Sequence, residues 1–254
     1  MLYAKKRKTG HWRPTSPHSP VSIQTRTRFL SLPTRLLPPL LLAGMILTSI
    51  ASALACGEEA GKLLVSCFRL GEPMTDWKLE KKEGQPVFQL EKEGDIVVLE
   101  LKSDRSSFGF SKEISVDLKK YPYLNWRWRV SALPNGGDTR KKKTDDAAAQ
   151  IYVLFPRGLT RLSLESVNYY WDNLPPKGTT GVAPTWKKSR VMVLRNREDG
   201  LNIWYAEKRN VYEDYKKLFG KEPPTVGGVT VYINSQHTQS SAAASLAEIF
   251  FSTE

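Results

Sequence analysis

The sequence has 254 residues, 40% hydrophobic and 25% charged, which is enough for one or two folded domains. Its formal net charge of +12 would suit a nucleic-acid-binding protein, but residues 1–55 hold eight of these excess positive charges and no acidic residue. The rest of the chain carries only +4, so we expect no nucleic-acid partner.

Residues 1–55 have the pattern of a secretory leader. A basic segment is followed by an apolar stretch that ends in the small-residue pattern A-L-A at Ala55. This order predicts a signal peptide cleaved after Ala55 and a periplasmic or extracellular protein formed by residues 56–254. The apolar stretch is shorter than the roughly 20 residues that span a bilayer. The alternatives are an uncleaved leader or a lipid on Cys56, and only through these would the protein contact a membrane.

Cysteine and histidine are scarce beyond the leader. Cys56 and Cys67 are the only cysteines and could pair in an exported protein. His237 is the single histidine outside the leader, so we expect no metal site built from histidine and cysteine. No serine lies in a G-x-S-x-G motif, and we therefore expect His237 to be a locally hydrogen-bonded loop residue rather than part of a catalytic triad.

Beyond the leader, short runs of β-branched and aromatic residues alternate with clusters of Gly, Pro, Asn and Asp. The runs cover residues 62–68, 86–91, 95–102, 107–114, 123–130, 149–155, 189–195, 201–209, 226–234 and 245–252. This pattern predicts one all-β domain, an antiparallel β-sandwich of the jelly-roll type. The first and last runs are both apolar, and we expect them to pair.

One helix is predicted at residues 211–219, where apolar residues recur at helical spacing before Gly220 and two prolines. A second short helix is indicated at residues 164–173.

The segment 123–130 alternates strictly between apolar and polar residues, as a β-strand does. Trp126 and Trp128 share the face that we expect in the core, while Arg127 and Arg129 share the other face. The same alternation in three other predicted strands assigns further polar residues to second faces. If these strands are neighbours, the candidate ligand-binding patch consists of Arg127, Arg129, Tyr152, Tyr205, Glu207 and Asn234.

Such a patch combines planar rings with hydrogen-bonding groups, which is what a glycan requires, because sugar C–H faces stack on aromatic rings and hydroxyl groups need polar partners. The alternative is an ordinary solvated sheet face with cross-strand Arg–Glu and Arg–Tyr pairs.

Asp145 and Asp146 precede a predicted strand and complete the candidate ligand-binding residues. Together with Glu207 they could act in glycoside hydrolysis. They could also bind a structural calcium ion, or cap a turn and pair with an arginine. Nearby, the basic run 140–143 is expected to be a solvated loop, with contact to anionic envelope polymers as the alternative.

Two tryptophans in loop-like stretches, Trp171 and Trp186, could either form the rim of a ligand site or close one end of the core.

Several long strings resemble a bacterial exported family known as domain of unknown function 3047. In order they are "YPYLNWRWRV", "DDAAAQIYVLF", "SVNYYWDN", "YAEKRNVYEDYKKLFGKEPP", "GGVTVYINSQHT" and "AEIFFS". The resemblance covers roughly Trp77 to Ser252 and implies a secreted β-sandwich similar to carbohydrate-binding modules. It implies no particular activity.

The sequence therefore favours an exported, non-catalytic β-sandwich that needs no cofactor and binds a glycan or another cell-envelope component. The alternatives are a polysaccharide hydrolase that uses Asp145, Asp146 and Glu207, and a purely structural envelope protein.

Overall fold

The computed structural model describes residues 58–59, 61–158 and 163–254. The expected leader and Cys56 fall outside these residues, whereas Cys67 lies within them and is disulfide-bonded. In the described part of the chain, no helix has the length and hydropathy that a membrane span requires.

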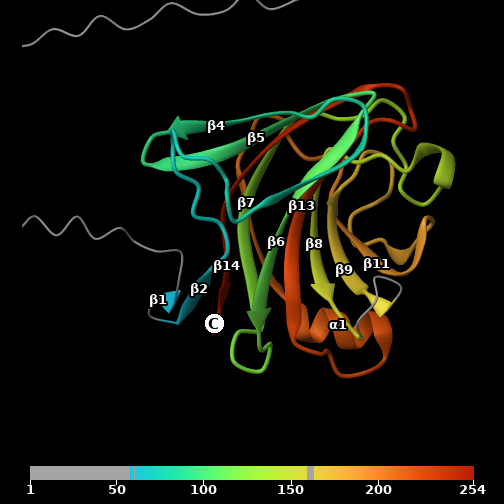
Figure 1. The fold of residues 1–254 in the computed structure, drawn as a ribbon. Coiled ribbons are helices and arrows are strands. Elements are labelled where there is room, and N and C mark those ends of the chain that lie inside the picture. Colours follow the sequence, from blue (N-terminus) through green and yellow to red (C-terminus); the bar gives the residue numbers. More distant parts are fainter. Residues whose placement is uncertain (1–57, 60, 159–162) are drawn as a thin grey trace, which may run out of the picture. The chain divides into compact units, whose positions relative to one another are not determined.

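The described residues form two seven-stranded sheets, whose strands are shown in Figure 1. Sheet A contains β1 (Glu58–Glu59), β2 (Lys62–Leu64), β4 (Val87–Glu93), β5 (Ile96–Asp104), β7 (Tyr123–Ala132), β12 (Tyr205–Asn210) and β14 (Ser241–Ser252). Sheet B contains β3 (Lys78–Glu83), β6 (Ser107–Val116), β8 (Ala149–Phe155), β9 (Glu165–Trp171), β10 (Thr180–Ala183), β11 (Trp186–Arg195) and β13 (Val226–Asn234).

The long strand β14 organises sheet A. It pairs with β7 along one side, and with β5 and β2 along the other. Leu63 of β2 lies opposite Phe251 of β14, which confirms the expected pairing of the first and last predicted strands. A bulge in β14, where Glu248 has a φ of 52°, interrupts the register with β7.

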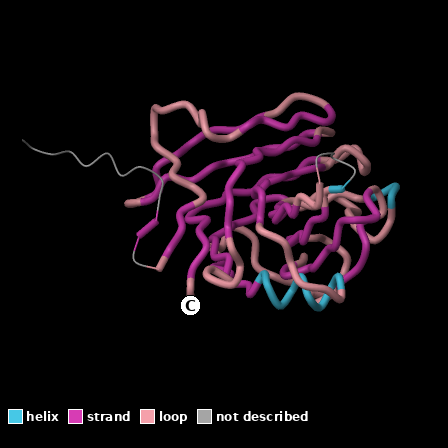
Figure 2. Tube along the Cα trace, turned by 60° about the horizontal axis from the view of Figure 1, so that its bottom comes forward, coloured by secondary structure: helices cyan, strands magenta, loops and turns pink. Residues whose placement is uncertain are grey.

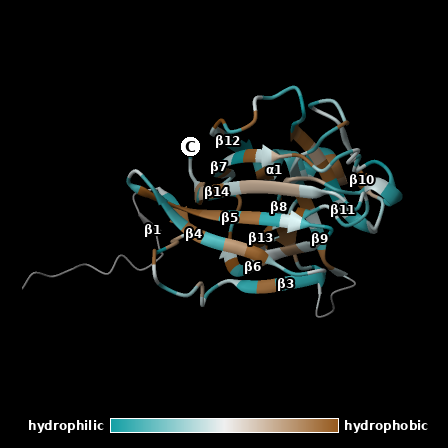
Figure 3. Ribbon diagram, turned by 90° about the horizontal axis from the view of Figure 1, so that it is seen from above, coloured by the Kyte–Doolittle hydropathy of each residue, from teal (hydrophilic) through white to brown (hydrophobic). Residues whose placement is uncertain are grey.

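Sheet B has the strand order β10-β11-β9-β8-β13-β6-β3. Every neighbouring pair in it is antiparallel except β9 and β11. The all-β jelly-roll sandwich predicted from the sequence is therefore confirmed. Figure 3 shows why the edge strand β3 is hard to predict: it is mainly hydrophilic, whereas β5 is largely hydrophobic.

The core lies between the inner faces of the two sheets, and its centre is aromatic. Trp126 and Trp128 of sheet A are 1% and 0% exposed, as their alternation predicts. Their rings lie 5.3 Å from Tyr169 and 5.8 Å from Trp171, both of sheet B. These contacts join the sheets across the core, because each ring buries a large apolar area against the opposite sheet.

The helix α1 (Val211–Phe219) confirms the predicted helix and its end. Asn210 caps its first turn by accepting a hydrogen bond from the backbone N–H of Glu213, and Gly220 ends it in the left-handed conformation, with φ at 69°. Figure 2 shows α1 at the periphery of the strands. Its Tyr215 is fully buried and packs 4.6 Å from Phe155 of β8.

The second helix indicated at residues 164–173 is wrong, because this segment forms strand β9. All seven residues of β9 are buried, so its two faces contact different parts of the protein.

Candidate functional site

A cleft of about 470 Å³ lies on the outer face of sheet B. Its lining reaches from Glu80 and Lys82 on the edge strand β3 to Trp186 at the start of β11, near the opposite edge. The floor is built from alternate residues of β13, β8 and β9, whose other residues face the core. We call this hollow the sheet-B cleft.

Three tyrosine rings lie side by side across the floor of the sheet-B cleft. Tyr152 of β8 stacks on Tyr232 of β13, with ring centroids 5.8 Å apart and an interplanar angle of 26°. Tyr170 of β9 lies 6.0 Å from Tyr152 on its other side. Burial raises the pKa of Tyr152 and of Tyr170 above the usual tyrosine value, so both hydroxyl groups remain protonated at neutral pH.

Two amide side chains form a hydrogen-bonded group at one end of the floor. The Oδ1 atom of Asn234 accepts hydrogen bonds from the backbone N–H of Ala147, at 2.9 Å, and from Nε2 of Gln150. The Oε1 atom of Gln150 in turn accepts a hydrogen bond from the hydroxyl group of Tyr152. These bonds connect the end of β13 to the start of β8 and fix the orientation of the Tyr152 ring.

A second polar group lies on β9 and β11. Asn168, which is 2% exposed, donates a hydrogen bond from Nδ2 to Oγ of Ser189 at 2.6 Å, and Ser166 donates to the same oxygen at 2.9 Å. Oδ1 of Asn168 is buried and has no hydrogen-bond partner among the described residues.

Asp145 lines the cleft close enough to its three tyrosines for its charge to raise their pKa values. Burial raises the pKa of its carboxyl to about 6, and the nearby charges of His237 and Lys82 and a hydrogen bond from Thr185 counteract this only in part. The backbone carbonyl of Asp145 also accepts a hydrogen bond from Nδ2 of Asn234.

Asp146 points away from its neighbour into the protein and is fully buried. Its carboxylate accepts hydrogen bonds from the backbone N–H groups of His237 and Thr238, from the Thr238 hydroxyl at 2.7 Å, and lies 3.1 Å from Nδ1 of His237. Asp146 therefore anchors the loop after β13, and His237 is a locally hydrogen-bonded loop residue.

The structure corrects the expectation of one patch that contains all the predicted residues. Arg127 and Arg129 belong to sheet A, whereas Tyr152 and Asn234 belong to sheet B, so these residues lie on different sheets. Both arginines have acidic partners: Arg127 lies 3.0 Å from Glu248, at the β14 bulge, and Arg129 binds Glu93.

Tyr205 and Glu207 are also outside the cleft. Both lie on β12, opposite Trp128 and Trp126 of β7. Glu207 accepts hydrogen bonds from Nε1 of Trp128 at 3.1 Å and from Nε of Arg195 at 2.7 Å. The ring of Tyr205 packs 5.3 Å from Trp171. These side chains face the core side of sheet A.

Of the predicted residues, the structure therefore brings Asp145, Tyr152 and Asn234 together in the cleft, with Asp146 behind them. The three acids of the hydrolase alternative do not converge, because Glu207 lies on sheet A and Asp146 faces inward. No group of three or more His, Cys, Asp or Glu residues within the described ranges is arranged to hold a metal ion.

The sequence interpretation missed the contribution of β9. The string "SVNYYW" alternates as a strand does, with Tyr169 and Trp171 facing the core and Asn168 and Tyr170 facing the cleft. This period of two was the sequence signal that could have identified β9 as a strand. The two tryptophans whose role the sequence left open have different positions. Trp171 is fully buried in the core, and Trp186 is 38% exposed at the cleft.

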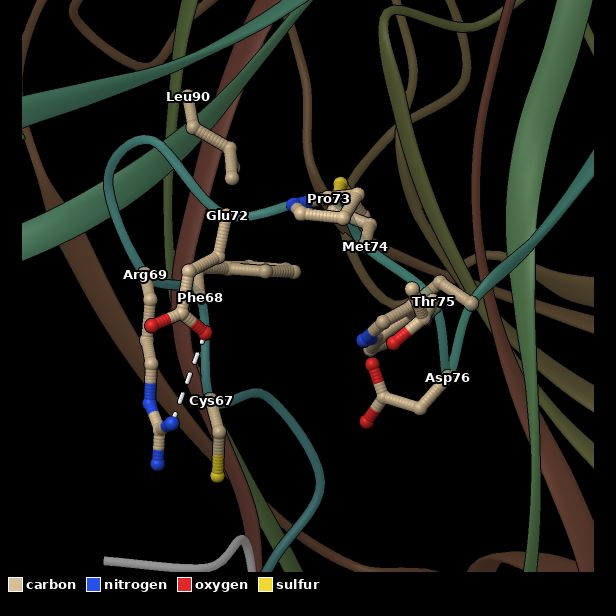
Figure 4. A pocket seen from close by; sticks show the side chains of 10 residues that line it. Cys67, Phe68, Arg69, Glu72, Pro73, Met74, Thr75, Asp76 and Leu90 are labelled. Carbon is tan, nitrogen blue, oxygen red and sulfur yellow. Dashed lines mark ion pairs between the residues drawn. The ribbon is translucent and has the colours of Figure 1, made fainter. Parts of the chain in front are cut away.

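A second, smaller hollow of about 220 Å³ lies beside the strap formed by residues 67–77 (Figure 4). Apart from Leu90, its lining comes from this one segment, and it includes an ion pair of 3.5 Å between the exposed side chains of Arg69 and Glu72. It lacks the convergence of polar and aromatic side chains from several strands that characterises the sheet-B cleft.

The family model described as "Protein of unknown function (DUF3047)" matches residues 72–250. The chain belongs to this family. No curated protein matches the chain.

Several solved structures are similar to this chain at low identity and low TM-score. A family 11 carbohydrate-binding module from Clostridium thermocellum, in complex with a β-1,3-1,4-mixed-linked tetrasaccharide, has 8% identity and a TM-score of 0.38, with coverage of 76% of this chain and 96% of that one. The family 11 xylanase from Neocallimastix patriciarum has 12% identity and a TM-score of 0.39, covering 77% and 98%. The xyloglucanase domain of NopAA from Sinorhizobium fredii has 12% identity and a TM-score of 0.38, covering 70% and 93%. The ligand of this chain has to be inferred from its own side chains.

Proposed function

We propose that this chain is an exported, non-catalytic protein that binds a glycan in the sheet-B cleft. The observation that carries the proposal is the row of tyrosine rings, Tyr232, Tyr152 and Tyr170, set among amide and hydroxyl side chains on adjacent strands.

The chemistry of the cleft suits a sugar. The C–H faces of a pyranose ring pack on aromatic rings, and its hydroxyl groups require a small number of fixed polar partners. The floor offers the rings and the polar groups of Gln150, Asn168 and Asn234. At the rim, Trp186 is the large aromatic side chain that is most available to a ligand, because it is 38% exposed.

The acids that the sequence suggested for hydrolysis do not meet in the cleft. Glycosidases of the common type use two carboxyl groups about 5 to 10 Å apart on either side of the scissile bond. The acids that the sequence suggested for this role are separated, since Asp145 faces the cleft, Asp146 anchors a loop and Glu207 binds Arg195.

Export is supported by the basic, then apolar, then A-L-A order of residues 1–55. Mass spectrometry of the N-terminus of the mature protein tests it. A chain that begins with unmodified Cys56 is expected; a diacylglyceryl group on Cys56 would make the protein a lipoprotein, and an intact leader would contradict cleavage.

Glycan binding is tested by probing a glycan array with the purified protein and with two variants. Trp186→Ala should weaken binding roughly tenfold, as the loss of an aromatic contact residue does. Phe88→Ala is the matched control, because Phe88 is similarly exposed, at 43%, but lies on β4 of sheet A. Binding to no glycan would refute the proposal, and release of reducing ends from a bound polysaccharide would refute its non-catalytic part.

A further inference from the structure

The buried oxygen of Asn168 indicates what kind of chemical group the sheet-B cleft accepts. Asn168 lies in the middle of the floor, opposite Tyr152 of β8 on one side and Val191 of β11 on the other. Its Nδ2 atom is used by Ser189, but its Oδ1 atom has no donor among the described residues. A buried acceptor without a donor is costly, so this position requires a donor from outside the protein.

Three of the neighbouring donors are already engaged. Nε2 of Gln150 donates to Asn234, and the hydroxyl group of Tyr152 donates to Gln150. The hydroxyl group of Ser166 donates to Ser189. Among these side chains, Oδ1 of Asn168 is the buried acceptor that is left without a donor.

The charges of the cleft exclude a strongly anionic ligand. Its described lining contains no arginine. Its one lysine, Lys82, interacts with the carboxylate of Asp145, and its one histidine, His237, lies 3.1 Å from the carboxylate of Asp146. Glu80 adds a further negative charge and lies 3.0 Å from Lys78. Recognition of uronic acids, sulfates or phosphates would require unpaired arginine or lysine side chains, which this lining does not offer.

We propose that the sheet-B cleft selects an uncharged glycan, and that Oδ1 of Asn168 accepts a hydrogen bond from one of its hydroxyl groups. This inference rests on the proposed function, because it specifies the ligand class of the same site. Asn168 is thereby a specificity-determining residue: its contribution depends on an acceptor atom, not on the volume of the side chain.

Affinity electrophoresis of the purified protein tests the ligand class. The gels contain a neutral polymer (mixed-linkage β-glucan, galactomannan or hydroxyethylcellulose) or an anionic one (polygalacturonate or alginate). Retardation by at least one neutral polymer and by neither anionic polymer is expected. Retardation by the anionic polymers alone would overturn this inference while leaving glycan binding intact. Binding to none of these polymers, together with an empty glycan array, would overturn both.

Variants of Asn168 test the acceptor. Asn168→Leu keeps the shape of the side chain but removes the oxygen, and should weaken binding of the retarding polymer roughly tenfold. Asn168→Asp keeps an oxygen acceptor and should stay within about threefold of the parent. Asn125→Leu is the matched control, because Asn125 lies on the polar face of β7 in sheet A. Equal losses for Asn168→Leu and Asn168→Asp, or no loss for either, would overturn the assignment.

A measurement on the parent protein keeps the test independent of variant folding. The side-chain carbonyl carbon resonance of Asn168 should shift when a soluble fragment of the retarding neutral polymer is added, because its oxygen gains a hydrogen bond. An unchanged Asn168 resonance, while the resonances of Tyr152 and Tyr170 move, would show that the ligand does not use this acceptor.

Discussion

Arg129 donates hydrogen bonds to both carboxylate oxygens of Glu93, at 2.5 and 3.2 Å, and joins β7 to the end of β4. The guanidinium group also lies 4.7 Å from the ring of Trp204, whose indole N–H donates to the same carboxylate. The hydrogen bonds from Arg129 lower the pKa of Glu93, although burial opposes them. The polar face of β7 is therefore held together by charged pairs, and ligand binding by this face stays a prediction.

Replacement of Arg129 by Ala should lower the free energy of unfolding by about 1 to 2 kcal/mol, because a bidentate, partly buried pair and a ring contact are lost. Arg127→Ala is the comparison. Its guanidinium group also lies 5.3 Å from the ring of Trp204, but its pair with Glu248 is a single contact between side chains that are 36% and 44% exposed, so the cost should stay below about 1 kcal/mol. Chemical denaturation measures both. Equal costs, or a loss of glycan binding in either variant, would contradict this assignment.

The Asp145→Asn variant should be more stable than the parent at neutral pH. The pKa of Asp145 rises from 3.8 to about 6 on folding, mainly through burial. Between these values the folded protein binds more protons than the unfolded chain, so the free energy of unfolding falls as the pH increases through this window. Asparagine removes the buried charge, and the gain at pH 8 should reach up to about 3 kcal/mol.

Near pH 4 the Asp145→Asn variant and the parent should unfold at similar temperatures, because the parent carboxyl is then protonated. Asp146→Asn is the control at the adjacent position: it weakens the hydrogen bonds to the loop after β13 and should destabilise the protein at both pH values. Thermal unfolding at pH 4 and pH 8 measures the difference. A stabilisation by Asp145→Asn that does not depend on pH would show that charge is not its cause.

Glu165 should have the opposite pH dependence. Burial disfavours its charge, but hydrogen bonds from Lys221, Tyr215 and Arg157 outweigh burial and lower its pKa from 4.5 to about 2. Its ionised form therefore stabilises the fold above pH 4.5, and this contribution is lost as the pH falls through 2. Glu165→Gln should cost up to about 3 kcal/mol at pH 7. The cost should shrink in acid, as urea unfolding at pH 7 and pH 2.5 would show; a constant cost would contradict the ionic origin.

The architecture could be predicted because strands with a single buried face carry a period of two. In "NWRWRV" this period identifies the core tryptophans, and apolar runs at both ends of the domain indicate the β2–β14 pair. The site was only partly predictable, because alternation assigns a residue to a face of its own strand but not to a sheet. Tyr152 and Tyr205 have the same signature in sequence, yet β8 and β12 belong to different sheets.

Strand β9 shows a second limit of prediction. Its inner residues contact the core, and its outer residues line the cleft. All of them are buried, so polar and aromatic residues are buried on both faces. The apolar contrast that identifies an amphipathic strand is therefore weak in "SVNYYW". The acidic partners of the two arginines could not be predicted either. Glu93 lies more than thirty residues before Arg129, and Glu248, the partner of Arg127, lies at a bulge.

Gly109 of β6 leaves the space that the Tyr232 ring occupies on the cleft floor. The two residues are directly opposite in the β6–β13 pair. A Cβ atom at Gly109 would lie 2.6 Å from Cδ2 of Tyr232 and would also contact the carbonyl oxygen of Val231. Because backbone atoms cannot move without breaking the strand pairing, the ring and β6 would both have to shift.

Gly109→Ala should therefore lower the free energy of unfolding by about 2 to 3 kcal/mol, and should weaken glycan binding in the fraction that remains folded, because Tyr232 leaves its position against Tyr152. Gly181→Ala on β10 is the matched control, since a Cβ atom there has no neighbour within 4 Å. Denaturation curves and affinity electrophoresis of both variants provide the measurement. A Gly109→Ala variant that keeps the parent's stability but loses binding would mean that the ring moves freely; one that keeps both would mean that Tyr232 does not depend on Gly109.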